Sequence, residues 1–272
     1  MLGKPVAHSL SPVIHNAGYA AAGLAGWSYV TIECAEAELP GLVAGLGPEW
    51  AGLSLTMPLK QAALAVADAA SPLATTLGAA NTLVRRDGGW FAENTDAGGV
   101  CDALRGAGVT RVETVAVLGA GGTARAALAA ARDLGASSVT VYTRRATAVD
   151  ELGPVASALG LEVSHVDFAA AAAATAEVVI STVPAGAADP LATALRWPPE
   201  TVLLDVLYHP WPTPLAAAAA TAGCRVVSGL DMLLGQAARQ FELFTGVSAP
   251  VVAMRAALTS HCHQQNTHPS WH

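Results

Sequence analysis

Hydrophobic and polar positions change their spacing repeatedly along the chain, and this patterning predicts a mixed α/β fold. Short segments with the two-residue period of a strand alternate with segments spaced like a helix. In the first part of the chain, strands are expected at residues 27–32, 53–56, 81–84 and 90–91, and helices at 39–46, from Pro58 onward and at 102–108. Asp87-Gly88-Gly89, between the last two strands, predicts a hairpin turn.

From residue 114 the predicted strands become continuous apolar runs, which is typical of parallel strands covered on both faces. These strands are expected at residues 114–118, 139–142, 178–181, 202–207 and 225–227. An Ala-rich helix to about Leu134 follows the first, and an amphipathic helix over 232–244 follows the last. Because alternation of strand and helix indicates βαβ units and a parallel sheet, we predict two α/β domains.

The composition and charge exclude several classes of protein. Hydrophobic residues make up 53% of the 272 positions and charged residues 13%, so the chain can bury cores and intrinsic disorder is excluded. The net charge of −7 argues against a nucleic-acid partner, which needs a basic surface. No apolar stretch approaches the roughly 20 residues of a membrane span, and the first residues lack an apolar signal segment. Cysteines without CxxC spacing favour a reduced, cytoplasmic chain.

A glycine-rich segment lies between the apolar run 114–118 and the Ala-rich helix, where a dinucleotide-binding fingerprint is expected. Its residues are Gly119, Ala120, Gly121, Gly122, Thr123 and Ala124. Gly119 permits a tight turn, Gly121 lets the backbone approach a pyrophosphate, and the small Ala124 allows close packing of the helix on the strand. The helix N-terminus then offers N–H groups and a positive dipole to phosphates. A glycine-rich turn that binds nothing is the alternative.

The end of the next strand distinguishes NAD from NADP. NAD sites place Asp or Glu there to bind the ribose 2′-hydroxyl, whereas this chain has Thr143, Arg144 and Arg145 and no acid. Two guanidinium groups suit a 2′-phosphate through bidentate, charge-assisted hydrogen bonds. We therefore predict NADP(H) as the cofactor. Arginines that are merely part of a solvated surface are the alternative.

Candidate substrate-binding and acid–base residues lie in the first half. Ser9 and Ser11 place two hydroxyls on an extended segment and would form a seat for a carboxylate, although Ser11 before Pro12 equally predicts a helix N-cap. Lys60 is expected on the first turn of a helix, where the helix dipole opposes an ammonium and favours proton donation. Lys4 and Lys60 are the only lysines against twelve arginines, which favours a specific use of Lys60. A surface lysine is the alternative.

Four further polar residues complete the candidate site. Asp96 precedes a helix and is either an acid paired with Lys60 or an N-cap. Asn81 and Gln236 carry amides that both donate and accept, which suits a polyol, although Gln236 also fits an exposed position on an amphipathic helix. Tyr208 follows a buried strand, at the edge where open α/β sheets bind ligands.

These segments, in this order, resemble the shikimate dehydrogenase family. The matching segments are 3–12, 53–60, 80–82, 94–96, 119–124, 181–184, 205–210 and 229–236. The resemblance implies reversible, NADPH-dependent reduction of 3-dehydroshikimate to shikimate, in the biosynthesis of chorismate and aromatic amino acids. It implies a catalytic pair of Lys60 and Asp96, carboxylate contacts from Ser9, Ser11 and Tyr208, and ring-hydroxyl contacts from Thr56, Asn81, Asp96 and Gln236. The cofactor contacts that it implies come from residues 119–124, Thr143, Arg144, Arg145, Thr182 and Gly229.

The implied fold is an N-terminal α/β substrate domain plus a Rossmann-type doubly wound NADP domain, with the C-terminal helices returning to the first domain. Residues 1–97, completed by 230–258, would form the substrate domain, and 98–229 the NADP domain. The polar tail 259–272 is expected to be disordered, and its histidines are assigned no metal. The expected partners are small molecules alone, with neither nucleic acid nor membrane, and the protein is expected to be a monomer or homodimer.

The chain departs from the family pattern in three places. Ser54 stands where asparagine is commoner, and Thr143-Arg144-Arg145 stands where Asn-Arg-Thr is usual, which still leaves two guanidinium groups. The family also has a β-strand before Gly3, where this chain has only Met1 and Leu2, so we expect an inner strand of the first domain to be missing. Two alternatives share nearly every motif: a quinate/shikimate dehydrogenase that uses NAD, and an aminoshikimate dehydrogenase. A third alternative is a non-catalytic NADP sensor on the same fold, which loss of Lys60 or Asp96 would mark, and both residues are present.

Overall fold

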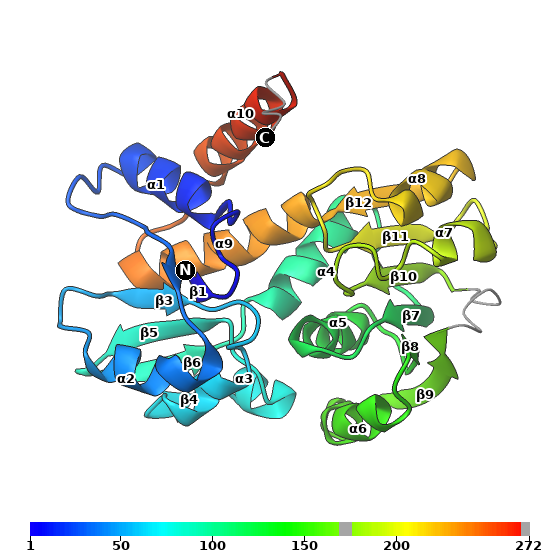
Figure 1. Cartoon of the computed structure of the whole chain (residues 1–272), viewed down its shortest axis with the longest axis horizontal. Helices are drawn as coiled ribbons and strands as arrows, with labels where there is room; N and C mark the ends of the chain where they lie inside the picture. Colours follow the sequence, from blue (N-terminus) through cyan, green and yellow to red (C-terminus); the bar gives the residue numbers. More distant parts are fainter. Residues whose placement is uncertain (169–175, 268–272) are drawn as a thin grey trace. The chain divides into compact units, whose positions relative to one another are not determined.

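The chain forms two compact units in this computed structural model, which describes residues 1–168 and 176–267 (Figure 1). Unit 1 consists of Met1–Thr75, Ala79–Thr95 and the chain from Gln236 onward. Unit 2 consists of Thr76–Gly78 and Asp96–Gly235. The domain boundaries expected from the sequence, after residue 97 and before residue 230, lie a few residues from this division.

Unit 2 is built on a sheet of six parallel strands. The strands are β7 (Thr114–Leu118), β8 (Ser138–Thr143), β9 (Glu162–Asp167), β10 (Val178–Ser181), β11 (Val202–Asp205) and β12 (Arg225–Ser228). They lie in the order β12-β11-β10-β7-β8-β9 (Figure 1), so the sheet extends in both directions from the neighbours β7 and β10. This is the strand order of the doubly wound Rossmann fold. The predicted Rossmann-type architecture is confirmed.

The helices of unit 2 pack on this sheet through small and apolar side chains. They are α4 (Asp96–Gly106), α5 (Gly122–Asp133), α6 (Thr147–Leu159), α7 (Leu191–Ala194) and α8 (Pro214–Thr221). Every residue of α5 from Ala124 to Ala131 is buried, and most of them are alanines, so α5 approaches β7 and α4 closely. At the start of α8 the Thr213 hydroxyl accepts a hydrogen bond from the Ala216 N–H at 3.0 Å.

Unit 1 contains a four-stranded mixed sheet in the order β3-β5-β6-β4. Its strands are β3 (Gly52–Ser54), β4 (Ala69–Ala70), β5 (Thr82–Arg86) and β6 (Gly89–Glu93). β5 and β6 form the predicted antiparallel hairpin. Asp87 and Gly88 between them have φ values of 50° and 83°, which define the type I′ turn that matches the twist of a hairpin.

A short inner strand is present in unit 1, contrary to the prediction. β1 (Leu2–Gly3) pairs in parallel with β2 (Ile32–Glu33), and Leu2 also bridges to Leu55. The Leu2 carbonyl oxygen accepts from the Thr56 N–H at 2.9 Å, and the Leu2 side chain is fully buried. The prediction of a missing strand was wrong because these residues already supply the backbone groups that the pairing needs.

The strand predicted at residues 27–32 was also wrong, since only Ile32 of that range is in β2. The backbone of Tyr29 is bonded instead to the side chain of Asn16. Asn16 Nδ2 donates to the Tyr29 carbonyl oxygen at 3.0 Å, and the Tyr29 N–H donates to Asn16 Oδ1 at 2.8 Å. A side-chain amide thus takes the place of a neighbouring strand.

The helical elements of unit 1 differ from the prediction at Pro58. The helical elements are α1 (Ser11–Ala21), η1 (Glu36–Glu38), α2 (Leu39–Ala44), η2 (Ala62–Ala65), α3 (Pro72–Leu77), α9 (Gly229–Thr245) and α10 (Val251–Thr267). The last residues of α3 and the first residues of α9 belong to unit 2. No α-helix opens at Pro58: residues 57–61 form turns before the short 3-10 helix η2, so the argument from a helix dipole does not apply to Lys60. Within unit 2, the helix expected over 102–108 begins earlier, at Asp96.

The tail predicted to be disordered is helical over residues 259–267, where α10 continues. Met254 and Leu258 are buried, and α10 packs on α1. The packing is close, because a Cβ on Gly18 of α1 would lie 3.2 Å from Met254 Cγ. Residues 268–272 lie outside the described part of the chain. Within the described residues, no helix is both long and apolar enough to cross a bilayer.

Candidate active site

The turn after β7 is tight and requires glycine at its first position. Gly119 has a φ of 100°, and its N–H donates to the Tyr142 carbonyl oxygen at 2.8 Å. A Cβ on Gly119 would lie 2.8 Å from Thr182 Oγ1, and this hydroxyl is itself held by a 2.7 Å hydrogen bond to the Leu118 carbonyl oxygen. The turns after β7 and β10 therefore meet where the strand order reverses, which is the ligand crevice of doubly wound sheets.

The N-terminus of α5 fits a pyrophosphate. Its N-cap, Gly121, is extended and provides no side-chain cap. No other part of the described chain lies within 4 Å of the position that a Cβ on Gly121 would take. Gly121 is exposed, and Ala120, Gly122 and Thr123 beside it are half-buried. The first turn of a helix leaves N–H groups without an intrahelical acceptor, which suits a phosphate at this end of α5. Ala124 is fully buried where α5 meets the sheet.

Two exposed arginines and no acid follow the end of β8. Thr143 Oγ1 accepts a hydrogen bond from the Arg145 N–H at 3.2 Å, which bends the backbone after the strand. The Arg145 guanidinium forms an ion pair with Glu151 Oε1 of α6 at 3.5 Å. Arg144 is exposed. These groups fit a 2′-phosphate, which would accept charge-assisted hydrogen bonds from the guanidiniums.

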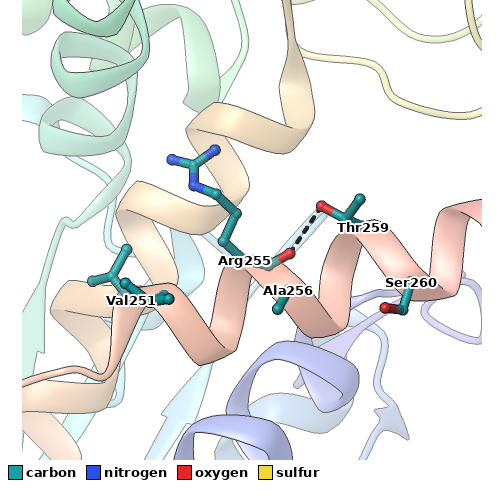
Figure 2. A pocket seen from close by; sticks show the side chains of 6 residues that line it. Val251, Arg255, Ala256, Thr259 and Ser260 are labelled. Carbon is teal, nitrogen blue, oxygen red and sulfur yellow. Dashed lines mark hydrogen bonds between the residues drawn. The ribbon is translucent and has the colours of Figure 1, made fainter.

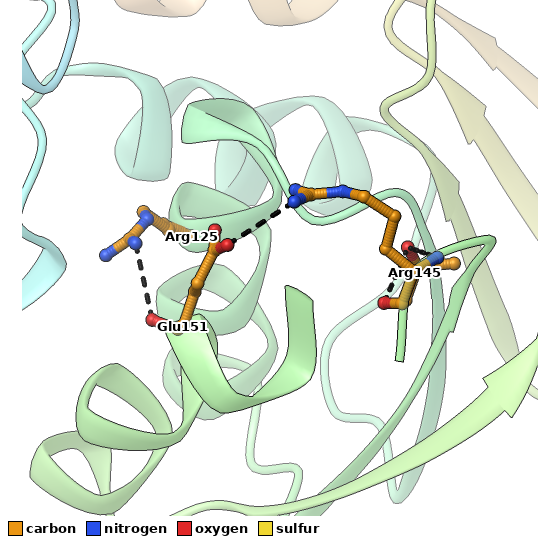
Figure 3. A network of polar contacts seen from close by, with 4 residues as sticks. Arg125, Arg145 and Glu151 are labelled. Carbon is orange, nitrogen blue, oxygen red and sulfur yellow. Dashed lines mark hydrogen bonds and ion pairs between the residues drawn. The ribbon is translucent and has the colours of Figure 1, made fainter. Parts of the chain in front are cut away.

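A buried arginine that the sequence analysis missed lies next to this pair. Arg125 follows the glycine-rich segment directly, and its Nη2 donates to the Glu151 carbonyl oxygen at 3.3 Å while its Nη1 donates to the Leu77 carbonyl oxygen at 2.9 Å (Figure 3). Burial lowers the pKa of Arg125, and the Glu151 carboxylate opposes this shift. Arg125 therefore connects α5 to α6, the helix that carries Glu151, the ion-pair partner of Arg145.

In unit 1 the structure brings Asn81 and Gln236 together. Asn81 Nδ2 donates to Gln236 Oε1 at 3.3 Å and to Thr95 Oγ1 at 2.9 Å, and Asn81 Oδ1 accepts from the Thr95 N–H at 2.8 Å. Both amide side chains are buried, so the alternative of an exposed Gln236 was wrong. Buried neutral amides that bond to each other keep a defined pattern of donors and acceptors.

Ser9 and Ser11 are also neighbours, but Ser11 does not cap α1. The N-cap is Leu10 and Ser11 is the first helical residue, so the N-cap alternative was wrong. The Ser9 hydroxyl accepts from the Ser11 N–H at 3.3 Å. The Ser11 hydroxyl is fully buried and makes no hydrogen bond of standard geometry in the described structure, although it is near enough to the Tyr29 hydroxyl to oppose the rise in the pKa of Tyr29 that burial causes. A buried hydroxyl of this kind is a candidate ligand contact, since leaving it unpaired is costly.

Lys60 and Thr56 lie on the connection between β3 and η2. Both are half-buried, and the backbone anchors them: the Lys60 carbonyl oxygen accepts from the Ala80 N–H at 2.7 Å, and the Thr56 carbonyl oxygen accepts from the Leu59 N–H at 2.8 Å. The Lys60 backbone is thereby bonded to Ala80, the residue that directly precedes Asn81. These residues belong to unit 1.

The remaining predicted site residues belong to unit 2. Asp96 is buried and is the first residue of α4. Tyr208 is half-buried and follows β11. A Cβ on Gly229, the first residue of α9, would collide with the Val206 carbonyl oxygen, so glycine is required there. Desolvation raises the pKa of the buried Asp205 at the end of β11, although the Thr213 hydroxyl donates to its carboxylate at 2.7 Å.

The sequence analysis missed three buried residues in the hydrogen-bond network of unit 1 that includes the Asn81 amide. Tyr29, Thr82 and Gln240 are buried and hydrogen-bonded around Ser54 and Asn81. The one available signal was the spacing of Gln236 and Gln240, which puts them on one face of α9.

A separate groove runs along α10 (Figure 2) and is lined by none of the predicted site residues. Its lining is Val251, Val252, Arg255, Ala256, Thr259 and Ser260. Among the described residues, no group of three or more His, Cys, Asp or Glu side chains is arranged to hold a metal ion. His268 and His272 lie outside the described residues.

The fold and these residues define a two-domain α/β protein with a Rossmann-type dinucleotide-binding unit. Residues 1–83 match the shikimate dehydrogenase substrate binding domain, 229–259 the shikimate 5′-dehydrogenase C-terminal domain, and 114–209 a coenzyme F420-dependent NADP oxidoreductase domain. The chain is 40% identical over 255 residues to the shikimate dehydrogenase (NADP(+)) of Caulobacter vibrioides, covering 90% of this chain and 88% of the relative. The chain belongs to the shikimate dehydrogenase family.

Solved structures agree with this assignment. The shikimate dehydrogenase of Mycobacterium tuberculosis has a TM-score of 0.87 and 49% identity, covering 95% of this chain and 97% of that chain. The Thermus thermophilus shikimate 5-dehydrogenase in complex with NADP(H) and shikimate has a TM-score of 0.83 and 34% identity, covering 95% and 97%. The similarity therefore extends over both units.

Proposed function

We propose that this protein catalyses the reversible, NADPH-dependent reduction of 3-dehydroshikimate to shikimate. The observation that carries the proposal is the combination of Lys60 and Asp96, in matching sequence contexts, with 40% identity to a relative named for this activity. The lack of an acid after β8 and the presence of Arg144 and Arg145 favour NADP over NAD.

Unit 2 is the proposed NADP domain. The N-terminus of α5, with residues 119–124, would hold the pyrophosphate through backbone N–H groups. Thr143, Arg144 and Arg145 would bind the 2′-phosphate, and Thr182 and Gly229 would border the rest of the cofactor. The open space at Gly121 and the strict need for glycine at Gly119 support this assignment. When bound, NADPH supplies the hydride to the carbonyl carbon of the substrate.

Unit 1 is the proposed substrate domain, and its polar residues would bind and orient the ring. Ser9 and Ser11, together with Tyr208 of unit 2, would hold the carboxylate, and the unpaired hydroxyl of Ser11 supports this role. Thr56, Asn81 and Gln236 would bind ring hydroxyls. Neutral donors and acceptors suit these hydroxyls because each hydroxyl both donates and accepts.

Lys60 is the proposed proton donor. Its ammonium would give a proton to the carbonyl oxygen as negative charge develops there, and it would take the proton back in the reverse direction. Asp96 would pair with Lys60 and bind a ring hydroxyl. A lysine suits this step because it exchanges its proton, whereas an arginine remains charged.

The cellular setting is proposed on the same grounds. Cys34, Cys101, Cys224 and Cys262 form no disulfide with one another, which suits a reducing cytoplasm. Only small molecules are needed as partners, and a monomer or a homodimer would satisfy the proposal, because every proposed contact comes from one chain.

The test follows nicotinamide absorbance as purified protein meets shikimate or quinate, each with NADP⁺ or NAD⁺. We expect rapid reduction of NADP⁺ with shikimate. Turnover of quinate with NAD⁺ instead would reassign the protein to the quinate-using relatives and show that the two arginines do not select the cofactor. Absence of turnover in every combination, with NADP⁺ binding retained, would identify a sensor.

A further inference from the structure

A run of buried hydrogen bonds leads from Tyr29 to the hydroxyl of Thr82 in unit 1. The Tyr29 hydroxyl donates to Ser54 Oγ at 2.6 Å, and the Ser54 hydroxyl donates to Gln240 Oε1 at 2.8 Å. Gln240 Nε2 then donates to Thr82 Oγ1 at 2.9 Å and to the Asn81 carbonyl oxygen at 3.2 Å. Three elements, β3, α9 and β5, are connected in this way.

The same run continues into the proposed substrate site. The Thr82 hydroxyl donates to Asn81 Oδ1 at 3.0 Å, and Asn81 Nδ2 donates to Gln236 Oε1 at 3.3 Å. All of the side chains in the run are buried, with exposed fractions of 8% or less. Bulk water therefore does not supply alternative partners to these groups, and a reversed amide would bring two donors or two acceptors together.

Along the run from Tyr29 to Gln236, each residue donates a hydrogen bond to the next. Ser54 and Thr82 each accept one hydrogen bond and donate the next, so their single hydroxyl protons are committed. The Thr82 hydroxyl and the Thr95 N–H, at 2.8 Å, both donate to Asn81 Oδ1. The oxygen end of the Asn81 amide therefore faces Thr82 and Thr95, and its nitrogen end faces Gln236. The Gln236 amide consequently turns its oxygen toward Asn81, and its nitrogen points away from Asn81.

We propose that Tyr29, Ser54, Gln240 and Thr82 are positioning residues that set the orientation of the Asn81 and Gln236 amides. The substrate hydroxyls then meet a fixed pattern of donors and acceptors, which discriminates between ring substituents. This inference rests on the proposed function, in which Asn81 and Gln236 bind the ring. The serine at position 54 suits the task because its hydroxyl accepts from Tyr29 and donates to Gln240.

The test compares Thr82→Val with Thr82→Ser. Valine has the shape of threonine but neither donates nor accepts, whereas serine keeps the hydroxyl. For Thr82→Val we expect kcat/KM for shikimate to fall about tenfold, chiefly through KM, because Asn81 Oδ1 loses one of its donors beside the Thr95 N–H and Gln240 Nε2 loses an acceptor. Thr82→Ser should restore at least half of the wild-type value. The Kd for NADP⁺, from direct titration of cofactor fluorescence, should stay within twofold in both variants.

A series of monodeoxy analogues of shikimate separates positioning from a merely structural role. Thr82→Val should lose much less on the analogue whose missing hydroxyl is the one bound by Asn81 or Gln236. Equal losses on shikimate and on every analogue would overturn the inference, as would equal KM values for Thr82→Val and Thr82→Ser. Wild-type protein that is inactive on shikimate would overturn the proposed function, and the inference with it.

Tyr29→Phe provides a second test if Thr82→Val does not fold. It removes the first donor of the run while keeping the ring that stacks on His15 at 4.3 Å. We expect KM for shikimate to rise by a factor of about two to five, with NADP⁺ binding unchanged. An unchanged KM in this variant would overturn the inference.

Discussion

Glu151 of α6 pairs with Arg145 through Oε1 and Nη1 at 3.5 Å, so the arginine proposed to bind the 2′-phosphate already has an anionic partner (Figure 3). A 2′-phosphate would have to compete with this carboxylate for the guanidinium. Both side chains are largely exposed, so the pair is weak and exchange is easy. We therefore expect the ion pair to lower the affinity for NADP and to leave the affinity for NAD unchanged.

Glu151→Gln should therefore tighten NADP⁺ binding. We expect the Kd for NADP⁺ to fall by a factor of about two to five, as for removal of an exposed ion pair, and the Kd for NAD⁺ to stay constant. Fluorescence titration at low and high salt measures both values. Asp150→Asn removes the same charge one residue away and is the control; equal effects of the two substitutions would show that the general field, and not the pair, matters.

Gly119→Ala should abolish or strongly weaken NADP⁺ binding. The substitution strains a φ of 100° and places a methyl group 2.8 Å from Thr182 Oγ1, which is fixed by Leu118. Gly186→Ala is the matched control, because Gly186 has a φ of 80° and an unobstructed Cβ position. We expect NADP⁺ affinity to fall at least tenfold in the first variant and less than twofold in the second. Similar losses in both would contradict the steric argument.

Lys60→Ala should remove turnover while the protein still binds NADP⁺. Loss of a general acid costs about 100-fold to 10,000-fold in kcat. Lys4→Ala is the control, since Lys4 is the only other lysine and is exposed. Steady-state rates and cofactor titration are measured on both variants. A Lys60→Ala variant that keeps most of its activity would contradict the role in proton transfer.

His15 should make the protein less stable in mild acid. Burial lowers the pKa of His15 from 6.5 to about 3, because the charged ring would lose its water, while the Gln240 side chain opposes the shift slightly. Between these values the unfolded chain binds a proton that the folded chain does not, so stability falls as the pH drops from 6.5 toward 3. At pH 5 this amounts to about 2 kcal/mol.

The measurement is the free energy of unfolding by urea at pH 5 and pH 7.5 for wild type and His15→Phe. Phenylalanine keeps an aromatic ring against Tyr29 but does not titrate. Burial also lowers the pKa of the Met1 α-amino group, to about 5, and the charge of this group is the second cause of the low pKa of His15. Its own titration contributes nearly equally to both proteins, because folded His15 is neutral at both pH values. The loss at pH 5 should be about 2 kcal/mol smaller in His15→Phe. A loss of equal size in both proteins would exclude His15 as its source.

Local patterns in the sequence were sufficient for most of unit 2. Continuous apolar runs predicted β7, β10 and β11, because strands covered on both faces need apolar side chains throughout. The glycine-rich segment was recognised because a tight turn and a close backbone approach can be made only with glycine. The hairpin at Asp87 and Gly88 followed from turn chemistry that depends on adjacent residues alone.

Other features were decided by contacts between distant residues. β9 was missed because it is an edge strand with few buried side chains. Residues 259–267 are helical because α10 continues past Met254 and Leu258, which are buried where it packs on α1, and no local pattern in the polar tail indicates this. The strand predicted at residues 27–32 was replaced by the bonds between Asn16 and Tyr29.

The sequence by itself determined the chemical groups of the site, because residue type sets what can donate, accept or exchange a proton. Tertiary structure decided how these groups are oriented. Ser54 is separated by 25 residues from Tyr29 and by 186 from Gln240, yet their hydrogen bonds share one buried run. Burial removes water as an alternative partner, so the direction of each hydrogen bond, and with it the orientation of Asn81, depends on neighbours that only folding brings together.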